Sequence, residues 1–232
     1  MQAFFPELLD SFLDMEFINK VCEKFHYEEI NLSELQAVAG EMLPLMRREA
    51  FWEVCAPWTW DCGEKTDAVY EGVVMTLGKG LDCLQESYHK EGMLTESYML
   101  EALASELLLH GYKAYNHHVR EAGGWHVARY HFPGSEKSLP LEVLPDMLSR
   151  FSVQVSCNEA FCIMPKKSVV FLAELTQDET VRCEGICVGC ENVRCSNRME
   201  EDAQLERIMT DMPLTYGYQR IFGKGIPWTW GR

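Results

Sequence analysis

Four of the chain's ten cysteines lie within thirteen residues near its C-terminal end. They are Cys183, Cys187, Cys190 and Cys195, with glycines between them. A loop this short can bring four thiolates to one ion or cluster, and thiolates are soft ligands that suit zinc and iron–sulfur clusters. We therefore expect these cysteines to bind metal. The compact spacing favours a 4Fe–4S cluster. Zinc is the alternative, although it commonly uses two separated C-x2-C pairs and only one is present here.

The position of the cysteines in the chain also limits the fold. The first three fit the C-x3-C-x2-C pattern of the radical S-adenosylmethionine enzymes, in which the motif precedes most of a β/α barrel. Only 42 residues follow Cys190, which are too few to build such a barrel. We therefore do not expect a radical enzyme.

The net charge and the N-terminal residues limit which cellular compartment and which classes of partner we expect. The chain has 21 Lys and Arg against 36 Asp and Glu, a formal net charge of −15 that repels phosphate backbones and anionic membrane surfaces. Asp10, Asp14 and Glu16 interrupt any apolar core of a signal peptide. No apolar run approaches the ~18 residues of a membrane helix. We expect a cytoplasmic protein with reduced cysteines that binds neither nucleic acid nor membranes.

Apolar periodicity predicts mixed helix and strand. The first half is expected to begin with helices over 6–50, with a capping box from Ser33 to Gln36 and a kink or restart at Pro44. An irregular aromatic connection over 51–67 and a strand over 68–77 are expected to follow. Two more helices are then expected, one marked by Leu81, Leu84 and Tyr88 and one over 98–110 that ends at Gly111. The second half is expected to hold a strand over 125–130, a helix over 139–151, strands over 151–156 and 168–175, and a charged helix over 197–212.

These elements predict an α+β fold, with N-terminal helices, a twisted and mainly antiparallel sheet flanked by helices, and a C-terminal cysteine-rich metal loop and helix. No compositional linker divides the chain, so we expect one compact domain overall. Within it, the expected regions are an N-terminal helical region over 1–67 that packs on the core, an α+β core over 68–180, and a cysteine loop, helix and aromatic tail over 181–232.

Three segments, over 74–82, 129–142 and 158–169, resemble segments of the reactivation domain of cobalamin-dependent methionine synthase. The first contains T-L-G before a helix, the second an arginine, a P-G turn and L-P-L-E, and the third N-E-A-F-C-I-M-P-K-K-S-V. In the short stand-alone form of this domain a C-x2-C-x4-C-x2-R pattern follows, here Cys187, Cys190, Cys195 and Arg198. The resemblance covers roughly 68–198.

The resemblance implies a ligand and its contacts. The reactivation domain binds S-adenosylmethionine beside a corrin while an electron is supplied, and methylation traps the reduced cobalt. The implied ligand-binding residues are Arg129, Pro133, Gly134, Ser135, Glu159 and Phe161, with Arg129 contacting the ligand carboxylate and Glu159 its ammonium group.

The ligand-binding segments also depart from the family's pattern. Three residues separate Arg129 from Pro133 where the family has two, and Ser135 and Phe161 replace tyrosines. Each lost hydroxyl costs about 1–3 kcal/mol if the ligand is buried against it. The alternative interpretation makes Arg129 a strand arginine beside a surface carboxylate and Pro133-Gly134 an ordinary type II turn.

We therefore expect an accessory protein for the reductive reactivation and methylation of a corrinoid methyltransferase. Its expected partners are a corrinoid-binding protein or a split methionine synthase subunit, which supplies the cobalamin, and an electron donor. It would be part of a methyltransferase activity in methionine biosynthesis without a catalytic residue of its own. The alternatives are a metal-stapled protein-binding module or an iron–sulfur electron carrier that has lost S-adenosylmethionine binding.

Overall fold

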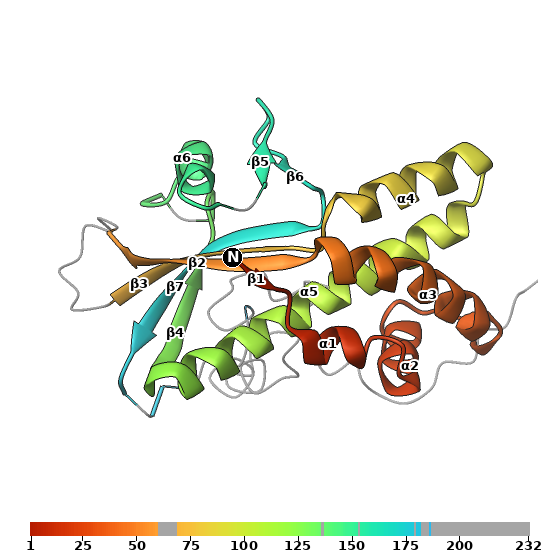
Figure 1. Ribbon diagram of the computed structural model, residues 1–232, viewed down its shortest axis with the longest axis horizontal. Helices are drawn as coiled ribbons and strands as arrows, with labels where there is room; N and C mark the ends of the chain where they lie inside the picture. Colours follow the sequence, from red (N-terminus) through yellow and green to blue (C-terminus); the bar gives the residue numbers. More distant parts are fainter. Residues whose placement is uncertain (60–68, 136, 153, 179, 182–185, 187–232) are drawn as a thin grey trace, which may run out of the picture. The chain divides into compact units, whose positions relative to one another are not determined.

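The computed structural model describes residues 1–59, 69–135, 137–152, 154–178, 180–181 and 186, which all lie in one unit of the chain, Met1–Gly189. Its centre is a five-stranded sheet in the order β1-β2-β3-β7-β4, with every neighbouring pair antiparallel (Figure 1). The strands are β1 (Gln2–Ala3), β2 (Phe51–Trp58), β3 (Val69–Thr76), β4 (His126–His131) and β7 (Ser168–Thr176). This arrangement confirms the predicted α+β class.

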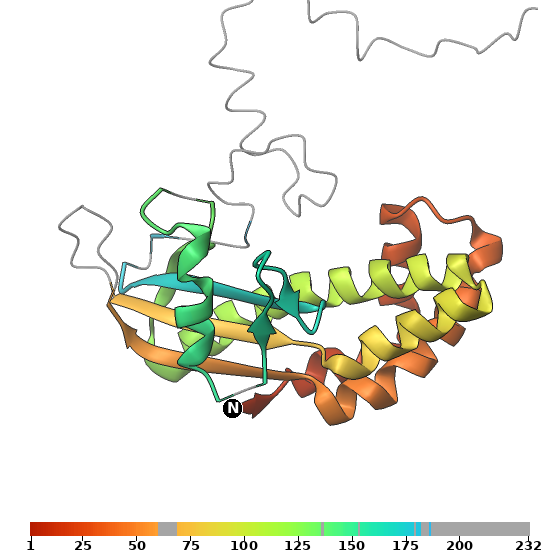
Figure 2. The same ribbon diagram turned by 90° about the horizontal axis from the view of Figure 1, so that it is seen from above.

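Helices cover both faces of the sheet. They are α1 (Pro6–Asp10), α2 (Met15–Lys24), α3 (Leu32–Glu49), α4 (Lys79–Glu91), α5 (Leu94–Gly123) and α6 (Leu144–Ser149), with 3-10 turns η1 (Glu29–Asn31) and η2 (Leu141–Val143). In Figure 1, α5 crosses one face, while α6 and a hairpin of β5 (Ser156–Cys157) and β6 (Ile163–Met164) lie over the other. Figure 2 shows α3, α4 and α5 continuing beyond one end of the strands, where they pack against one another.

The α5 face holds a closely packed aromatic core. Phe171 on β7 is fully buried, and its ring centroid lies 5.1 Å from that of Tyr112 and 5.7 Å from that of Tyr115, both on α5. Gly111 lies where the helix comes nearest the sheet, because a Cβ there would lie 3.1 Å from Phe4 Cζ and 3.2 Å from Met75 Sδ. The glycine therefore permits the close packing of α5.

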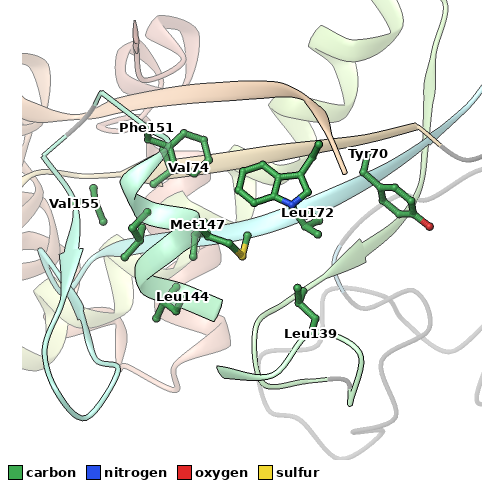
Figure 3. Close-up of a cluster of buried hydrophobic side chains, with 11 residues drawn as sticks. Tyr70, Val74, Leu139, Leu144, Met147, Phe151, Val155 and Leu172 are labelled. Atoms are coloured by element: carbon green, nitrogen blue, oxygen red, sulfur yellow. The ribbon is translucent and has the colours of Figure 1, made fainter. Parts of the chain in front are cut away.

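The opposite face holds a second apolar cluster beneath α6 (Figure 3). It consists of Trp58, Tyr70, Val74, Leu139, Leu144, Met147, Leu148, Phe151, Val155, Val170 and Leu172. The indole of Trp58 lies directly on the backbone of β3, since a Cβ at Gly72 would lie within 2.7 Å of its Cζ3. The Arg150 guanidinium also lies over the indole, with Cζ 4.3 Å from the ring centroid. This cluster fixes α6 and the segment after it against the sheet.

Several expected elements are confirmed. Strands β3, β4 and β7 match the strands expected over 68–77, 125–130 and 168–175, and α4 matches the helix marked by Leu81, Leu84 and Tyr88. The expected helix over 139–151 is present as η2 and the shorter α6. The expected helix over 197–212 lies outside the described residues.

Other expectations were wrong. Residues 51–58 form β2 instead of an irregular connection, because they pair with β3 from Phe51 opposite Thr76 to Trp58 opposite Tyr70. Helix α5 continues through Gly111 and ends at Gly124, whose φ of +66° suits a glycine C-cap. The strand expected over 151–156 shrinks to β5, because Phe151 and Val155 pack in the cluster under α6.

Helix α3 also differs from expectation at Pro44, where a kink or restart was predicted, and at Ser33, where a capping box was predicted. It runs without a restart through Pro44, which is exposed, while buried Leu43 and Met46 anchor the helix on either side of the proline. The capping box belongs to η1 instead, where Glu28 is the N-cap and Asn31 is the third helical residue, and Ser33 lies inside α3. At Pro44, burial of the apolar side of the helix outweighs the local signal.

Candidate functional site

A pocket of about 780 Å³ lies where β3 ends and α4 begins. Its walls come from four parts of the chain: Glu49 and Phe51 between α3 and β2, the junction from Thr76 to Asp82, the segment before and within β5, and Met164-Pro165 of the hairpin. Met1 completes the lining. Small-molecule sites commonly have volumes of about 300–1,000 Å³, so the pocket is large enough for a ligand of ordinary size.

Glycine shapes the junction between β3 and α4. Gly78 precedes the first residue of α4 with a φ of +91°, and a Cβ there would lie 2.9 Å from the backbone oxygen of Glu49. A side chain at this position would therefore be strained and would also push away the end of α3. The Gly78 N–H donates to Thr76 Oγ1 at 3.1 Å, which closes the turn.

Two carboxylates lie at the first turn of α4, that of Glu49 from the end of α3 and that of Asp82 from α4 itself. Glu49 Oε2 accepts the Gly80 N–H at 2.6 Å. Asp82 is only 7% exposed, and its carboxylate accepts the Lys166 N–H at 3.0 and 3.3 Å. Negative charge at a helix N-terminus is favourable, so both acids are placed where the helix stabilises them. Lys79 is exposed at the same turn and also lines the pocket.

A pair of buried hydroxyls supports the same end of the sheet. Thr76 and Ser168 are register partners at the ends of β3 and β7. The Ser168 hydroxyl donates to Thr76 Oγ1 at 2.7 Å, and both residues are less than 10% exposed. Thr76 is also part of the pocket lining.

Four of the six residues implied by the resemblance lie on β4 and the turn after it. Arg129 is exposed next to a bulge in β4 and stands opposite Glu174 of β7. The turn that contains Pro133, Gly134 and Ser135 has a Gly134 φ of +84° and a Ser135 N–H that donates to Phe132 O at 3.0 Å. These values describe a type II turn. The Ser135 hydroxyl donates to the same oxygen at 2.6 Å.

The remaining two residues lie on the turn between β5 and β6. Glu159 is exposed, and Phe161 is partly buried against the cluster under α6. Phe161 has a φ of +59° and its N–H donates to Asn158 O at 2.9 Å. The Asn158 side chain closes the turn by accepting the N–H groups of Ala160 and Cys162. Phe161 thus holds the hairpin against the core.

None of these six residues lines the pocket at the β3–α4 junction. The pocket is lined instead by other residues of the resembling segments: Thr76, Gly78, Lys79 and Asp82 from 74–82, and Met164 and Pro165 from 158–169. Two segments that are far apart in the sequence therefore meet at one cavity. The glycine pair and Asp82 in T-L-G-K-G-L-D were the only local signal for it, and Glu49 gave none.

His131 lies near the turn after β4 but is part of the sheet. It is 3% exposed, and its Nε2 lies 3.0 Å from Glu174 Oε2. Its ring meets that of Tyr70 edge to face, with centroids 6.0 Å apart. The contact with the Glu174 carboxylate satisfies the buried imidazole of His131 next to the apolar cluster.

The predicted metal ligands Cys183, Cys187, Cys190 and Cys195 lie outside the described residues. Among the residues that the structure does describe, no group of three or more His, Cys, Asp or Glu side chains could hold a metal ion. No helix in this part of the chain is both long and apolar enough to cross a membrane.

Comparison of the whole chain with known protein families found no family that matches, and comparison with curated proteins found no match either.

Proposed function

We propose that this chain is an accessory protein for the reductive reactivation of a corrinoid methyltransferase. In this role it binds S-adenosylmethionine and presents it to a corrin held by a partner protein, while a metal cluster on the cysteine-rich segment passes an electron. The observation that carries the proposal is the pocket at the β3–α4 junction, where residues from two of the three segments that resemble the reactivation domain meet.

The lining of the pocket suits this ligand. S-adenosylmethionine combines an aromatic base with an amino-acid end and a positively charged sulfur. Phe51, Val155 and Met164 give the pocket an apolar wall, and Glu49 and Asp82 give it negative charge. Pockets of this kind place a few polar groups on an apolar lining. The ligand supplies the methyl group, and the chain's own residues bind and orient it.

The cysteine-rich segment supplies the second half of the proposal. Four thiolates within thirteen residues suit an iron–sulfur cluster. Such a cluster would pass an electron from a donor protein to the corrin of the partner. Methylation is irreversible and draws an unfavourable reduction forward. The cobalamin belongs to the partner, so the chain needs no corrin-binding cavity of its own.

Ligand binding is tested by titrating the anaerobically purified protein with S-adenosylmethionine in a calorimeter. We expect saturable heat at micromolar to submillimolar ligand and displacement by S-adenosylhomocysteine. Absence of heat at millimolar ligand, with the metal site full, contradicts the proposal and favours a metal-stapled protein-binding module.

Electron transfer is tested by assaying iron, sulfide and zinc in the same preparation. We expect iron and sulfide in equal amounts and their loss in the Cys187→Ala/Cys190→Ala variant. A matched control is Cys83→Ala/Cys162→Ala, since both of these thiols are exposed and free. One zinc without sulfide excludes an electron carrier, and unchanged metal content in the first variant contradicts the cluster.

A further inference from the structure

We infer that the pocket at the β3–α4 junction holds the α-amino-acid end of a zwitterionic ligand, with Asp82 beside its ammonium group and Lys79 beside its carboxylate. These contacts differ from the Arg129 and Glu159 contacts that the resemblance implies. The inference rests on the proposed function only in the choice of S-adenosylmethionine as the principal ligand.

The charge of the lining is the first argument. Its charged side chains, among the described residues, are Lys79 against Glu49 and Asp82. The Met1 amino group also reaches this region, where it lies 3.9 Å from the Glu53 carboxylate. With the Met1 ammonium counted, the lining carries two positive and two negative charges. A lining that presents both signs of charge suits a zwitterion.

The state of Asp82 is the second argument. The residue is 7% exposed and lines the pocket. Among the described residues, the Lys166 N–H is its one hydrogen-bond donor. A carboxylate has about four acceptor sites, and a buried charge with unused sites is costly. An ammonium group with three donors would satisfy these sites from the pocket side.

Lys79 supplies a partner for a ligand carboxylate. Two N–H groups at the start of α4 are already taken, that of Gly80 by Glu49 and that of Gly78 by Thr76 Oγ1. Lys79 is exposed at the same turn and lines the pocket, so its ammonium group can meet a ligand carboxylate there. Thr76 Oγ1 accepts from both Gly78 and Ser168, so it is already engaged within the fold.

The opposite signs of Asp82 and Lys79 also fix an orientation. They are three residues apart in the first turn of α4, and residues at this spacing lie on one side of a helix. The ammonium and carboxylate of an α-amino acid are separated by a single carbon, so both can face this turn together. The rest of the ligand then extends along Val155 and Met164.

The inference is tested by calorimetry on full-length Asp82→Asn and Lys79→Met variants. Asparagine keeps an acceptor for the Lys166 N–H, so the fold is expected to survive, and the thermal unfolding midpoint checks this. We expect each variant to weaken S-adenosylmethionine binding about 10- to 100-fold. Matched controls on the same helix are Glu86→Gln and Lys90→Met, whose side chains are mostly exposed, and these are expected to bind as the unsubstituted protein does.

A second ligand separates binding from folding. Methylthioadenosine lacks the amino-acid end, so its weaker affinity should not change in Asp82→Asn or Lys79→Met. If these variants weaken both ligands equally, Asp82 and Lys79 act through the fold and the inference is wrong.

The remaining outcomes separate this inference from the proposed function. If Arg129→Met and Glu159→Gln abolish binding while Asp82→Asn and Lys79→Met do not, the inference fails and the proposed function stands. If L-methionine binds in an Asp82-dependent manner and S-adenosylmethionine does not bind at all, the inference stands without the proposed function. Binding of neither ligand overturns both.

Discussion

Glu106 is the most deeply buried charged side chain among the described residues, at 0% exposure in the middle of α5. Three cationic or donor groups surround it: Lys24 Nζ lies 2.6 Å from Oε2, and Lys20 Nζ and His110 Nε2 lie 3.0 and 3.3 Å from Oε1. Burial opposes ionisation, but hydrogen bonds from His110, Lys24 and Lys20 outweigh it and hold the pKa of Glu106 well below its ordinary value. The cluster joins α2 to α5.

Glu106→Gln should therefore destabilise the protein. The substitution keeps the size of the side chain but leaves two lysines without their counter-charge. Because Lys20 and Lys24 are 46% and 18% exposed, solvent offsets part of the loss, and we expect a cost of about 1–3 kcal/mol. Urea unfolding at neutral pH measures this loss. Glu121→Gln on the same helix is the matched control, because Glu121 is 71% exposed and its ion pair is with exposed His117. Equal stability of the two variants would contradict the role of the cluster.

The same carboxylate predicts a pH dependence. Because the pKa of Glu106 is lower in the folded than in the unfolded protein, its stabilisation is complete above the ordinary value of 4.5 and is lost as the pH falls towards the folded-state pKa. We expect the difference in unfolding free energy between the unsubstituted protein and Glu106→Gln to be constant near neutrality and to narrow below about pH 4.5. A difference that grows on acidification would contradict this assignment.

Among the secondary-structure elements, two helical glycines have opposite surroundings. Gly40 in α3 is exposed, and a Cβ there would meet nothing within 4 Å. Gly111 in α5 faces Phe4 and Met75 in the core. Helix propensity favours alanine over glycine at both positions by about 1 kcal/mol. A difference in unfolding free energy between a Gly→Ala change at Gly40 and one at Gly111 therefore measures the packing around Gly111.

Gly40→Ala is expected to raise the unfolding free energy by about 1 kcal/mol. Gly111→Ala is expected to lower it by about 1 kcal/mol, because overpacking a buried contact commonly costs more than the propensity gain. Chemical denaturation of both variants gives the comparison. A gain in stability at Gly111 as large as that at Gly40 would show that α5 does not press against the sheet there.

Gly111 also shows why the sequence predicts some elements better than others. Strands β3 and β7 are continuous apolar segments between clear turn residues, and they were expected at nearly their true bounds. The sequence predicts a helix end at Gly111 because glycine commonly caps helices. The contacts that explain this glycine instead are with Phe4 and Met75, which are far away in sequence. Residues 51–58 contain Pro57 and two tryptophans, and only pairing with β3 makes them a strand. Tertiary contacts decided these cases.

The candidate site follows the same rule. The pocket is lined by Glu49, the β3–α4 junction and residues of the hairpin. The local sequence of each segment does not predict that these segments meet in the fold. Residues of two of the resembling segments, 74–82 and 158–169, line the pocket. The six residues that the resemblance implies lie instead on β4 and on two turns. Ser135 and Phe161 proved to be part of the turns themselves, through a hydroxyl bond to Phe132 and packing against the core.

At the scale of the whole molecule, the two proposed roles fall on different parts of the sequence: ligand binding on residues before Thr176, and metal binding on the cysteines after it. The pocket lies at the end of the sheet where Thr76 pairs with Ser168. Strand β7 then runs from this end to Thr176, about 26 Å away at the spacing of a strand. The first cysteine of the proposed cluster follows seven residues later. Every residue of the cluster beneath α6 and of the pocket lining precedes Thr176.

A chain ending at residue 181 is therefore expected to fold and to keep its ligand while losing its metal. Its unfolding midpoint should fall by less than about 4 °C, corresponding to a loss of about 1 kcal/mol for a domain of this size. S-adenosylmethionine affinity should match that of the full chain, and iron and sulfide should be absent. The full-length Cys187→Ala/Cys190→Ala variant is the control, because it removes cluster ligands without shortening the chain. If truncation abolishes ligand binding and this variant does not, residues after 181 complete the ligand site, and the two roles are not separable.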